Sequence, residues 1–88
     1  MLKIKRTTKF EKDLIKAIER QYDTFKLQEI IKMLANEQKL PDKYRDHKLK
    51  GNFVGRRECH IEPDWLLIYK KEKDTLILER TGTHSDLF

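Results

Sequence analysis

Cysteine is nearly absent from this 88-residue chain, which carries only Cys59. A single cysteine excludes an internal disulfide framework and agrees with a reducing compartment. Long apolar runs are missing too: none approaches the roughly 20 residues that cross a bilayer, and the N-terminus lacks the apolar core of a signal peptide. We therefore expect a soluble, cytoplasmic protein that binds no membrane.

Motifs for several common chemistries are also absent. The chain has no Gly-rich phosphate loop and no Gly-x-Ser-x-Gly nucleophile elbow. It has no His-x-x-x-His or Cys-x-x-Cys pair, so neither a metal site nor another cofactor is expected. Internal repeats, low-complexity tracts and linkers are missing as well. At this length we expect one domain, residues 1–88, with a single modest core.

Charged residues, by contrast, are abundant. They make up 40% of the chain, and 20 Lys and Arg against 15 Asp and Glu give a formal net charge of +5. This moderate basic excess favours a polyanionic partner, either nucleic acid or an acidic protein. Many small basic domains bind no such partner, so charge alone leaves the function open.

The first half of the chain predicts one strand and two helices. Residues 2–6 alternate apolar and polar side chains, as in a half-buried strand. Thr8 and Glu11 have the spacing of a capping box and predict the start of a helix. Asp23 and Thr24 interrupt its apolar stripe and predict the start of a second helix. The short connection predicts an antiparallel helical hairpin that packs on a sheet as a scaffold.

The last third of the chain predicts three strands, which span residues 53–61, 65–69 and 75–80. Alternation in the first places Cys59 and Ile61 on one face, with Glu58 and His60 on the other. The second is almost continuously apolar, as expected of a central strand covered on both faces. The last five residues predict a tail or a single helical turn.

Between these two regions, from Lys39 to about Asn52, the periodicity fails. Pro41 and Gly51 punctuate this polar segment, and His47 lies in it among several lysines and arginines. A loop of this length in so small a domain usually has a function. An exposed histidine without a role is the alternative interpretation.

The order β-α-α-β-β-β predicts an α+β fold: a small curved, antiparallel-rich sheet with the helical hairpin on one face. The other face would stay partly open, with the loop and the C-terminal tail along its rim. An open, concave face with a positive rim suits a single nucleic-acid strand.

The three histidines all fall where the fold changes direction: His47 in the loop, His60 at a strand end and His84 in the tail. Imidazole suits general acid and base roles because its ordinary pKa is about 6.5. RNA cleavage without a metal needs such a base on the 2′-hydroxyl, an acid on the 5′-oxygen and a donor for the phosphorane charge. Asp64 or Glu58 could orient a histidine or balance its charge.

Other side chains could hold the nucleotide. Arg57 and Arg80 could bind phosphate bidentately. Trp65 and Phe88 could each stack on a base, at roughly 1–3 kcal/mol. Structural alternatives exist for these residues: Trp65 is more typical of a core, Arg80 of a surface ion pair and Glu58 of a cross-strand ion pair.

Three motifs together resemble the YafQ-like branch of the RelE/ParE superfamily of type II toxin–antitoxin toxins. The motifs are Tyr44–Gly51 (YRDHKLKG), Arg57–Tyr69 (RECHIEPDWLLIY) and Arg80–Phe88 (RTGTHSDLF). The order of elements agrees as well, so the resemblance covers nearly the whole chain and implies a RelE/ParE-like fold.

This resemblance implies a ribosome-dependent mRNA endoribonuclease, an mRNA interferase. Such toxins cut mRNA in the ribosomal A site by attack of the 2′-hydroxyl, leave a 2′,3′-cyclic phosphate and need no metal. By similarity, the catalytic set is His47, His60, Asp64 and His84, with His84 and Asp64 nearest the proton transfers and the other two nearest the phosphate. The implied substrate contacts are Glu58, Arg57, Trp65, Arg80, Phe88 and Lys50.

The resemblance also implies partners: a cognate antitoxin, mRNA on the ribosome, and operator DNA bound only through the toxin–antitoxin complex. Two other functions stay open. One is a non-catalytic ParE-like toxin or interaction domain, which the three histidines argue against. The other is a ribosome-independent ribonuclease.

Overall fold

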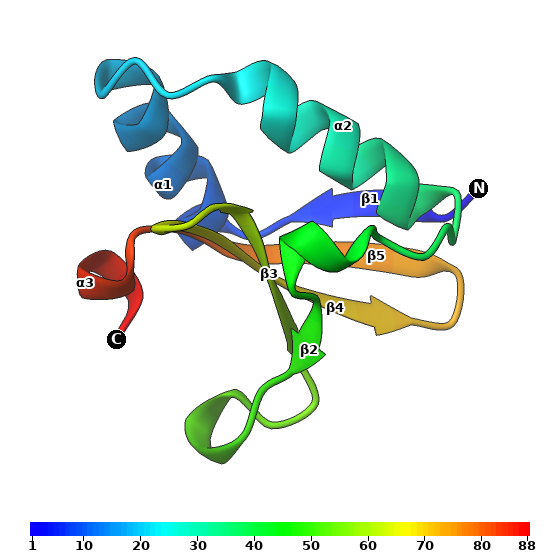
Figure 1. The fold of residues 1–88 in the computed structure, drawn as a ribbon. Helices are drawn as coiled ribbons and strands as arrows, with labels where there is room; N and C mark the ends of the chain where they lie inside the picture. The colour runs from blue at the N-terminus through cyan, green and yellow to red at the C-terminus, as the bar shows by residue number, and fades with distance from the viewer.

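A five-stranded sheet with the strand order β1-β5-β4-β3-β2 organises the chain, all 88 residues of which are described by this computed structural model (Figure 1). The strands are β1 (Lys3–Arg6), β2 (His47–Lys48), β3 (Arg57–Glu62), β4 (Trp65–Glu72) and β5 (Thr75–Gly82). The helices are α1 (Thr8–Glu19), α2 (Thr24–Ala35) and α3 (His84–Leu87). Only β1 and β5 pair in parallel, which confirms the predicted α+β fold with an antiparallel-rich sheet.

Side-chain caps start both long helices. The Thr7 hydroxyl accepts from the Phe10 N–H, one residue earlier than the predicted cap at Thr8. The Asp23 carboxylate accepts from the Phe25 N–H, as predicted for α2. Such a cap contributes about 1 kcal/mol to helix stability, because it satisfies an N–H that has no partner within the helix.

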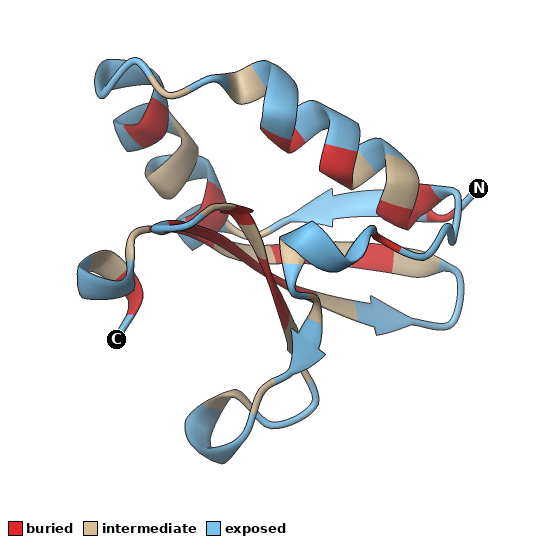
Figure 2. Ribbon diagram, in the orientation of Figure 1, coloured by how far each residue is buried: buried red, intermediate tan, exposed pale blue.

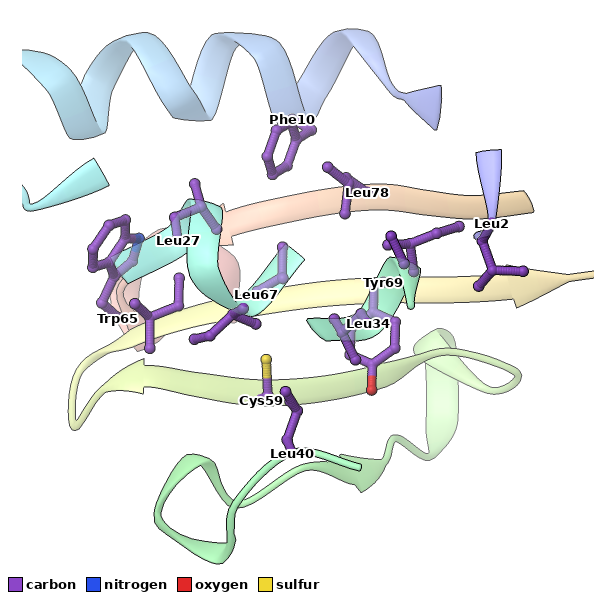
Figure 3. Packing of buried hydrophobic residues seen from close by; sticks show 14 of the residues in the cluster. Leu2, Phe10, Leu27, Leu34, Leu40, Cys59, Trp65, Leu67, Tyr69 and Leu78 are labelled. Atoms are coloured by element: carbon purple, nitrogen blue, oxygen red, sulfur yellow. The ribbon is translucent and has the colours of Figure 1, made fainter. Parts of the chain in front are cut away.

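Helices α1 and α2 lie on the same side of the sheet, and their buried residues face it (Figure 2). Phe10 and Leu27 from the helices point toward Leu67 and Leu78 of the strands in the main core (Figure 3). Burying a side chain of this size stabilises the fold by about 1.5–3 kcal/mol. Both helices pack on one face of the sheet, as predicted, and an apolar groove lies between them. Its apolar lining includes Ile4, Phe10, Leu14, Ile18, Leu27 and Ile31.

The opposite side of the sheet carries a much smaller core. Leu66 and Ile68 of the central strand β4 are fully buried there, together with Leu87 of α3. Leu49 and Phe53, from the segment between β2 and β3, pack against them. Strand β4 is therefore covered on both faces, as its apolar sequence predicted. Helix α3 and the β2–β3 segment lie away from helices α1 and α2 (Figure 1).

Residues 39–52 are more ordered than predicted. Short 3₁₀ turns at Asp42–Tyr44 and Gly51–Phe53 flank the two-residue strand β2. The strand predicted from residue 53 begins only at Arg57. Gly55 adopts a φ of +86°, which belongs to a turn and is not an extended conformation. Periodicity failed here since this segment is fixed by contacts with the rest of the chain.

No helix is both long enough and apolar enough to cross a membrane.

Candidate active site

Strand register brings His47 and Glu58 together. The two residues are direct partners in the antiparallel β2–β3 pair. His60 lies two residues after Glu58 on β3, so it projects from the same face. The register shifts between His60 and Glu62, a bulge of the kind that redirects side chains beside active sites.

Glu58 is the centre of this group. The Glu58 side chain is only 7% exposed, yet no Lys or Arg pairs with its carboxylate. Its Oε1 lies 3.5 Å from the Nε2 of His47 and 3.6 Å from the Nε2 of His60. A buried carboxylate needs a compensating charge or hydrogen bonds, and here only two imidazoles offer them.

The other nitrogen of each ring is occupied by the backbone. The Nδ1 of His47 lies 2.7 Å from the Arg45 carbonyl, and the Nδ1 of His60 lies 3.3 Å from the Pro63 carbonyl. Since a carbonyl only accepts, each Nδ1 carries the hydrogen. The Nε2 of each ring is therefore the nitrogen that faces the Glu58 carboxylate.

His84 has a different setting. It is the first residue of α3, and both its backbone N–H and its Nδ1 donate to Asp64 Oδ1, at 3.0 and 2.6 Å. These two bonds hold the pKa of the Asp64 carboxyl below its usual range, so it stays ionised at neutral pH. Because Nδ1 carries the hydrogen, Nε2 of the exposed ring is free to accept a proton.

The three imidazoles are neighbours. The ring centroid of His60 lies 5.7 Å from that of His84 and 6.3 Å from that of His47. The structure therefore brings together the four residues predicted to be catalytic, with Glu58 beneath two of them. Their catalytic roles stay predictions.

Phe88 and Lys50, two predicted substrate contacts, are both exposed. The Phe88 ring is 63% exposed and stands edge-on to Phe53, with centroids 5.5 Å apart. The Phe88 N–H bonds back to the His84 carbonyl, which ties the C-terminus to the histidine site. Lys50 is exposed just before the second 3₁₀ turn and makes no ion pair.

Trp65 requires a correction, since its side chain is 2% exposed and cannot serve as a stacking platform. Its ring packs against Tyr22, and its indole N–H donates to the Thr81 hydroxyl at 2.9 Å. The residue belongs to the main core.

Arg57 also differs from the prediction. Strand alternation places it on the helix-covered face with Cys59, away from Glu58 and His60, and its Nε donates to Asp46 at 3.2 Å. Burial raises the pKa of the Cys59 thiol on that face, which keeps the thiol protonated and inert.

Arg80 also differs from the prediction, because its guanidinium is bound by a carboxylate of the protein. It pairs across the sheet with Ile68, on the face that carries Glu58, but its Nε and one terminal nitrogen donate to Asp13 at 2.6 and 3.1 Å. The guanidinium is thus held bidentately by α1 and is not free for a bidentate phosphate contact.

Comparison with known proteins bears on this site. The family described as bacterial toxin of type II toxin–antitoxin system, YafQ, matches residues 2–88. The chain belongs to this YafQ family. It is 45% identical to the mRNA interferase toxin YafQ of Escherichia coli K12 over 80 residues, which cover 90% of this chain and 87% of the relative.

Solved YafQ-like structures agree with the fold. YafQ in the E. coli DinJ–YafQ toxin–antitoxin complex superposes with a TM-score of 0.91 at 41% identity, covering 100% of this chain and 99% of that one. A copper-bound mutant toxin from Helicobacter pylori gives a TM-score of 0.96 at 42% identity, with both chains fully covered. These matches confirm the predicted RelE/ParE-like fold and the resemblance on which it was based.

The copper in that relative raises the question of a metal in this chain. No group of three or more His, Cys, Asp or Glu side chains among residues 1–88 is arranged to hold a metal ion. We therefore derive no step through a metal.

Sequence reasoning missed the residues that position this YafQ-type site. Asp46 accepts from the Tyr69 hydroxyl at 2.6 Å as well as from Arg57, and so fixes the loop directly before His47. Asp86 binds Arg20 of α1 at 2.6 and 3.1 Å, which fixes α3. No local signal marks these pairs, because their partners are 11 to 66 residues away.

Proposed function

We propose that this YafQ-family chain is the toxin of a type II toxin–antitoxin system, an endoribonuclease that cuts mRNA in the A site of translating ribosomes and thereby stops translation. The name of the E. coli relative supports mRNA interferase activity. The observation that carries the proposal is the row of three imidazoles backed by two carboxylates, which supplies both an acid and a base.

His84 acts as the general base in this proposal. Its free Nε2 accepts the proton of the 2′-hydroxyl while Asp64 holds the Nδ1 hydrogen and balances the new positive charge. The 2′-oxygen then attacks the adjacent phosphorus. A positioned base of this kind contributes roughly 10²–10⁴-fold to the rate.

His47 and His60 act on the other side of the phosphorus. In-line displacement needs the acid opposite the base, and His60 has His84 and His47 as its two ring neighbours. Protonated His60 therefore stabilises the phosphorane, and protonated His47 gives its Nε2 proton to the departing 5′-oxygen. The O2′–P bond forms as the P–O5′ bond breaks, so the products are a 2′,3′-cyclic phosphate and a 5′-hydroxyl.

Partners follow from the same proposal. The E. coli YafQ is found in a DinJ–YafQ toxin–antitoxin complex, and we expect a cognate antitoxin to inhibit this chain as well. Operator DNA would be bound only by the toxin–antitoxin complex. The activity would take place in the cytoplasm, where messages are translated.

The experiment measures message cleavage by purified toxin, with and without ribosomes, together with growth after expression. Wild-type toxin is expected to cut only the translated message and to arrest growth, whereas His84→Gln does neither. Ser85→Ala is the control, since Ser85 is the exposed neighbour in the same helix.

Each alternative has a distinct result. Equal cleavage of naked RNA identifies a ribosome-independent ribonuclease. Growth arrest by both wild type and His84→Gln, without any cut message, identifies a ParE-like, non-catalytic toxin.

A further inference from the structure

A polar cavity lies beside the histidine row and shares His60 with it. Its volume is about 380 Å³, within the roughly 300–1,000 Å³ of ligand pockets. The 3₁₀ turn at Asp42–Tyr44, the end of β3 and the first turn of α2 line it. The residues that give it its chemistry are Lys26, Lys43, Tyr44, Arg45, His60 and Glu62.

This cavity has an excess of positive charge. Lys26 pairs with Glu62 at 3.7 Å, so these two charges offset each other. Lys43 and Arg45 are exposed and make no ion pair with any carboxylate. The ammonium of Lys43 lies 5.1 Å from the centroid of the Tyr44 ring, so an aromatic surface and a cation occur together. Phosphate groups and bases bind to this combination.

Backbone carbonyls connect the cavity to His47 and His60, the two histidines on the leaving-group side of the proposed site. Arg45 lines the cavity, and its carbonyl accepts from the Nδ1 of His47. Likewise, Pro63 lines the cavity and its carbonyl accepts from the Nδ1 of His60. The cavity thus adjoins the two histidines assigned to the phosphorane and the leaving 5′-oxygen.

The geometry points to a subsite for RNA: we infer that the cavity binds the nucleotide on the 3′ side of the cut, with Lys43 and Arg45 on that nucleotide's 3′-phosphate. This inference rests on the proposed function, because it takes the leaving 5′-oxygen to be at His47. An acidic protein segment would also be attracted to the two cations, but its binding would not require the cavity to lie next to a catalytic histidine. His60 lines both the cavity and the proposed cleavage site, and we therefore favour RNA as the ligand.

The test is a double-mutant cycle between toxin and message. Cleavage rates on programmed ribosomes are compared for two messages, which differ only in a neutral methylphosphonate at the first linkage downstream of the cut. Three toxins are used: wild type, Lys43→Gln/Arg45→Gln, and the control Lys12→Gln/Lys16→Gln. The control removes two exposed, unpaired cations from α1, which contributes nothing to the cavity.

Wild type and control are expected to cut the neutral-linkage message about tenfold more slowly, as for loss of a charge-assisted contact. The cavity variant should cut the native message about tenfold more slowly, with no further loss on the neutral linkage. Matching circular dichroism and thermal unfolding verify that it is folded.

The subsite would be overturned if the cavity variant lost a further tenfold in cleavage rate on the neutral-linkage message. The two cations would then act elsewhere, for example on the ribosome. A wild type indifferent to the neutral linkage would also overturn it, as would a variant that cuts at full rate but loses affinity for the antitoxin. Wild type that cuts neither message refutes the proposed function itself, so the two failures are distinguishable.

Discussion

Glu58 is the residue whose environment says most about the chemistry. Its buried carboxylate faces the Nε2 atoms of two imidazoles and pairs with no Lys or Arg. We regard Glu58 as a positioning residue, because it contacts the rings of His47 and His60 and holds them in place.

Replacing Glu58 by Gln tests this role. The amide keeps the shape but removes the counter-charge, so the cleavage rate at neutral pH should fall about tenfold. Glu29→Gln, which removes an exposed and unpaired acid on α2, serves as the control. An unchanged cleavage rate in Glu58→Gln would contradict the assignment.

Asp64 and His84 make a separate prediction. In Asp64→Asn the amide can donate to Nδ1 and move the histidine hydrogen to Nε2, which removes the base. The cleavage rate should fall by roughly 10²–10⁴-fold with unchanged thermal stability. Asp74→Asn is the matched control, because that exposed carboxylate contacts only Lys3 and the Thr75 hydroxyl and lies in the β4–β5 turn. Full activity of Asp64→Asn would show that another group accepts the proton.

At the scale of elements, α3 depends on its anchors, since an isolated four-residue helix is not stable. Asp86 closes a capping box with Thr83 and binds Arg20 of α1. The Asp86 side chain also packs closely against Gly82, where a Cβ would lie 2.9 Å from Asp86 Oδ2, so a larger residue at position 82 would displace Asp86. These contacts position His84.

The Arg20 contact holds the pKa of Asp86 well below its usual range, and this gives the sign of a pH effect. The ionised carboxylate stabilises the folded state above its unfolded pKa of about 3.9, and this contribution is lost as the pH falls below it. Asp86→Asn should therefore lower the cleavage rate severalfold at pH 7. Its stability deficit relative to wild type, measured by urea unfolding, should shrink between pH 5 and pH 3. A deficit that grows in acid would contradict the anchor.

The loop before His47 has its own anchor at Tyr69. Burial raises the pKa of this phenol, so its hydroxyl remains a donor to Asp46 at all physiological pH values. Tyr69→Phe should lower the free energy of unfolding by about 1–2 kcal/mol and slow cleavage, because Asp46 then keeps only Arg57. Urea unfolding and the cleavage rate measure both effects. Destabilisation without any loss of cleavage would show that the loop is positioned by other contacts.

Local sequence predicted the elements that depend on local signals. Strand β4 was evident from its apolar run and α2 from Asp23, since both signals act within a few residues. The two-residue strand β2 was not evident, because only its register against Glu58 on β3 defines it. Similarly, the sequence did not identify the partners of Arg57 and Arg80, which are Asp46 and Asp13 in the fold.

In the whole molecule, stability and chemistry are separated across the sheet. The main core lies between the sheet and helices α1 and α2, whereas the three histidines belong to β2, β3 and α3. The three sequence motifs contained the histidines predicted to be catalytic. Only the tertiary structure showed that these histidines contact Glu58 and Asp64 and that Trp65 is buried.

The most direct test of the central claim, attack by the 2′-hydroxyl under histidine catalysis, is a message with a single 2′-deoxy nucleotide at the mapped cut site, translated on ribosomes with wild-type toxin. We predict that the ribose message is cut to a 2′,3′-cyclic phosphate and a 5′-hydroxyl, and that the 2′-deoxy message stays intact at that position. Cleavage of the 2′-deoxy linkage would contradict this account.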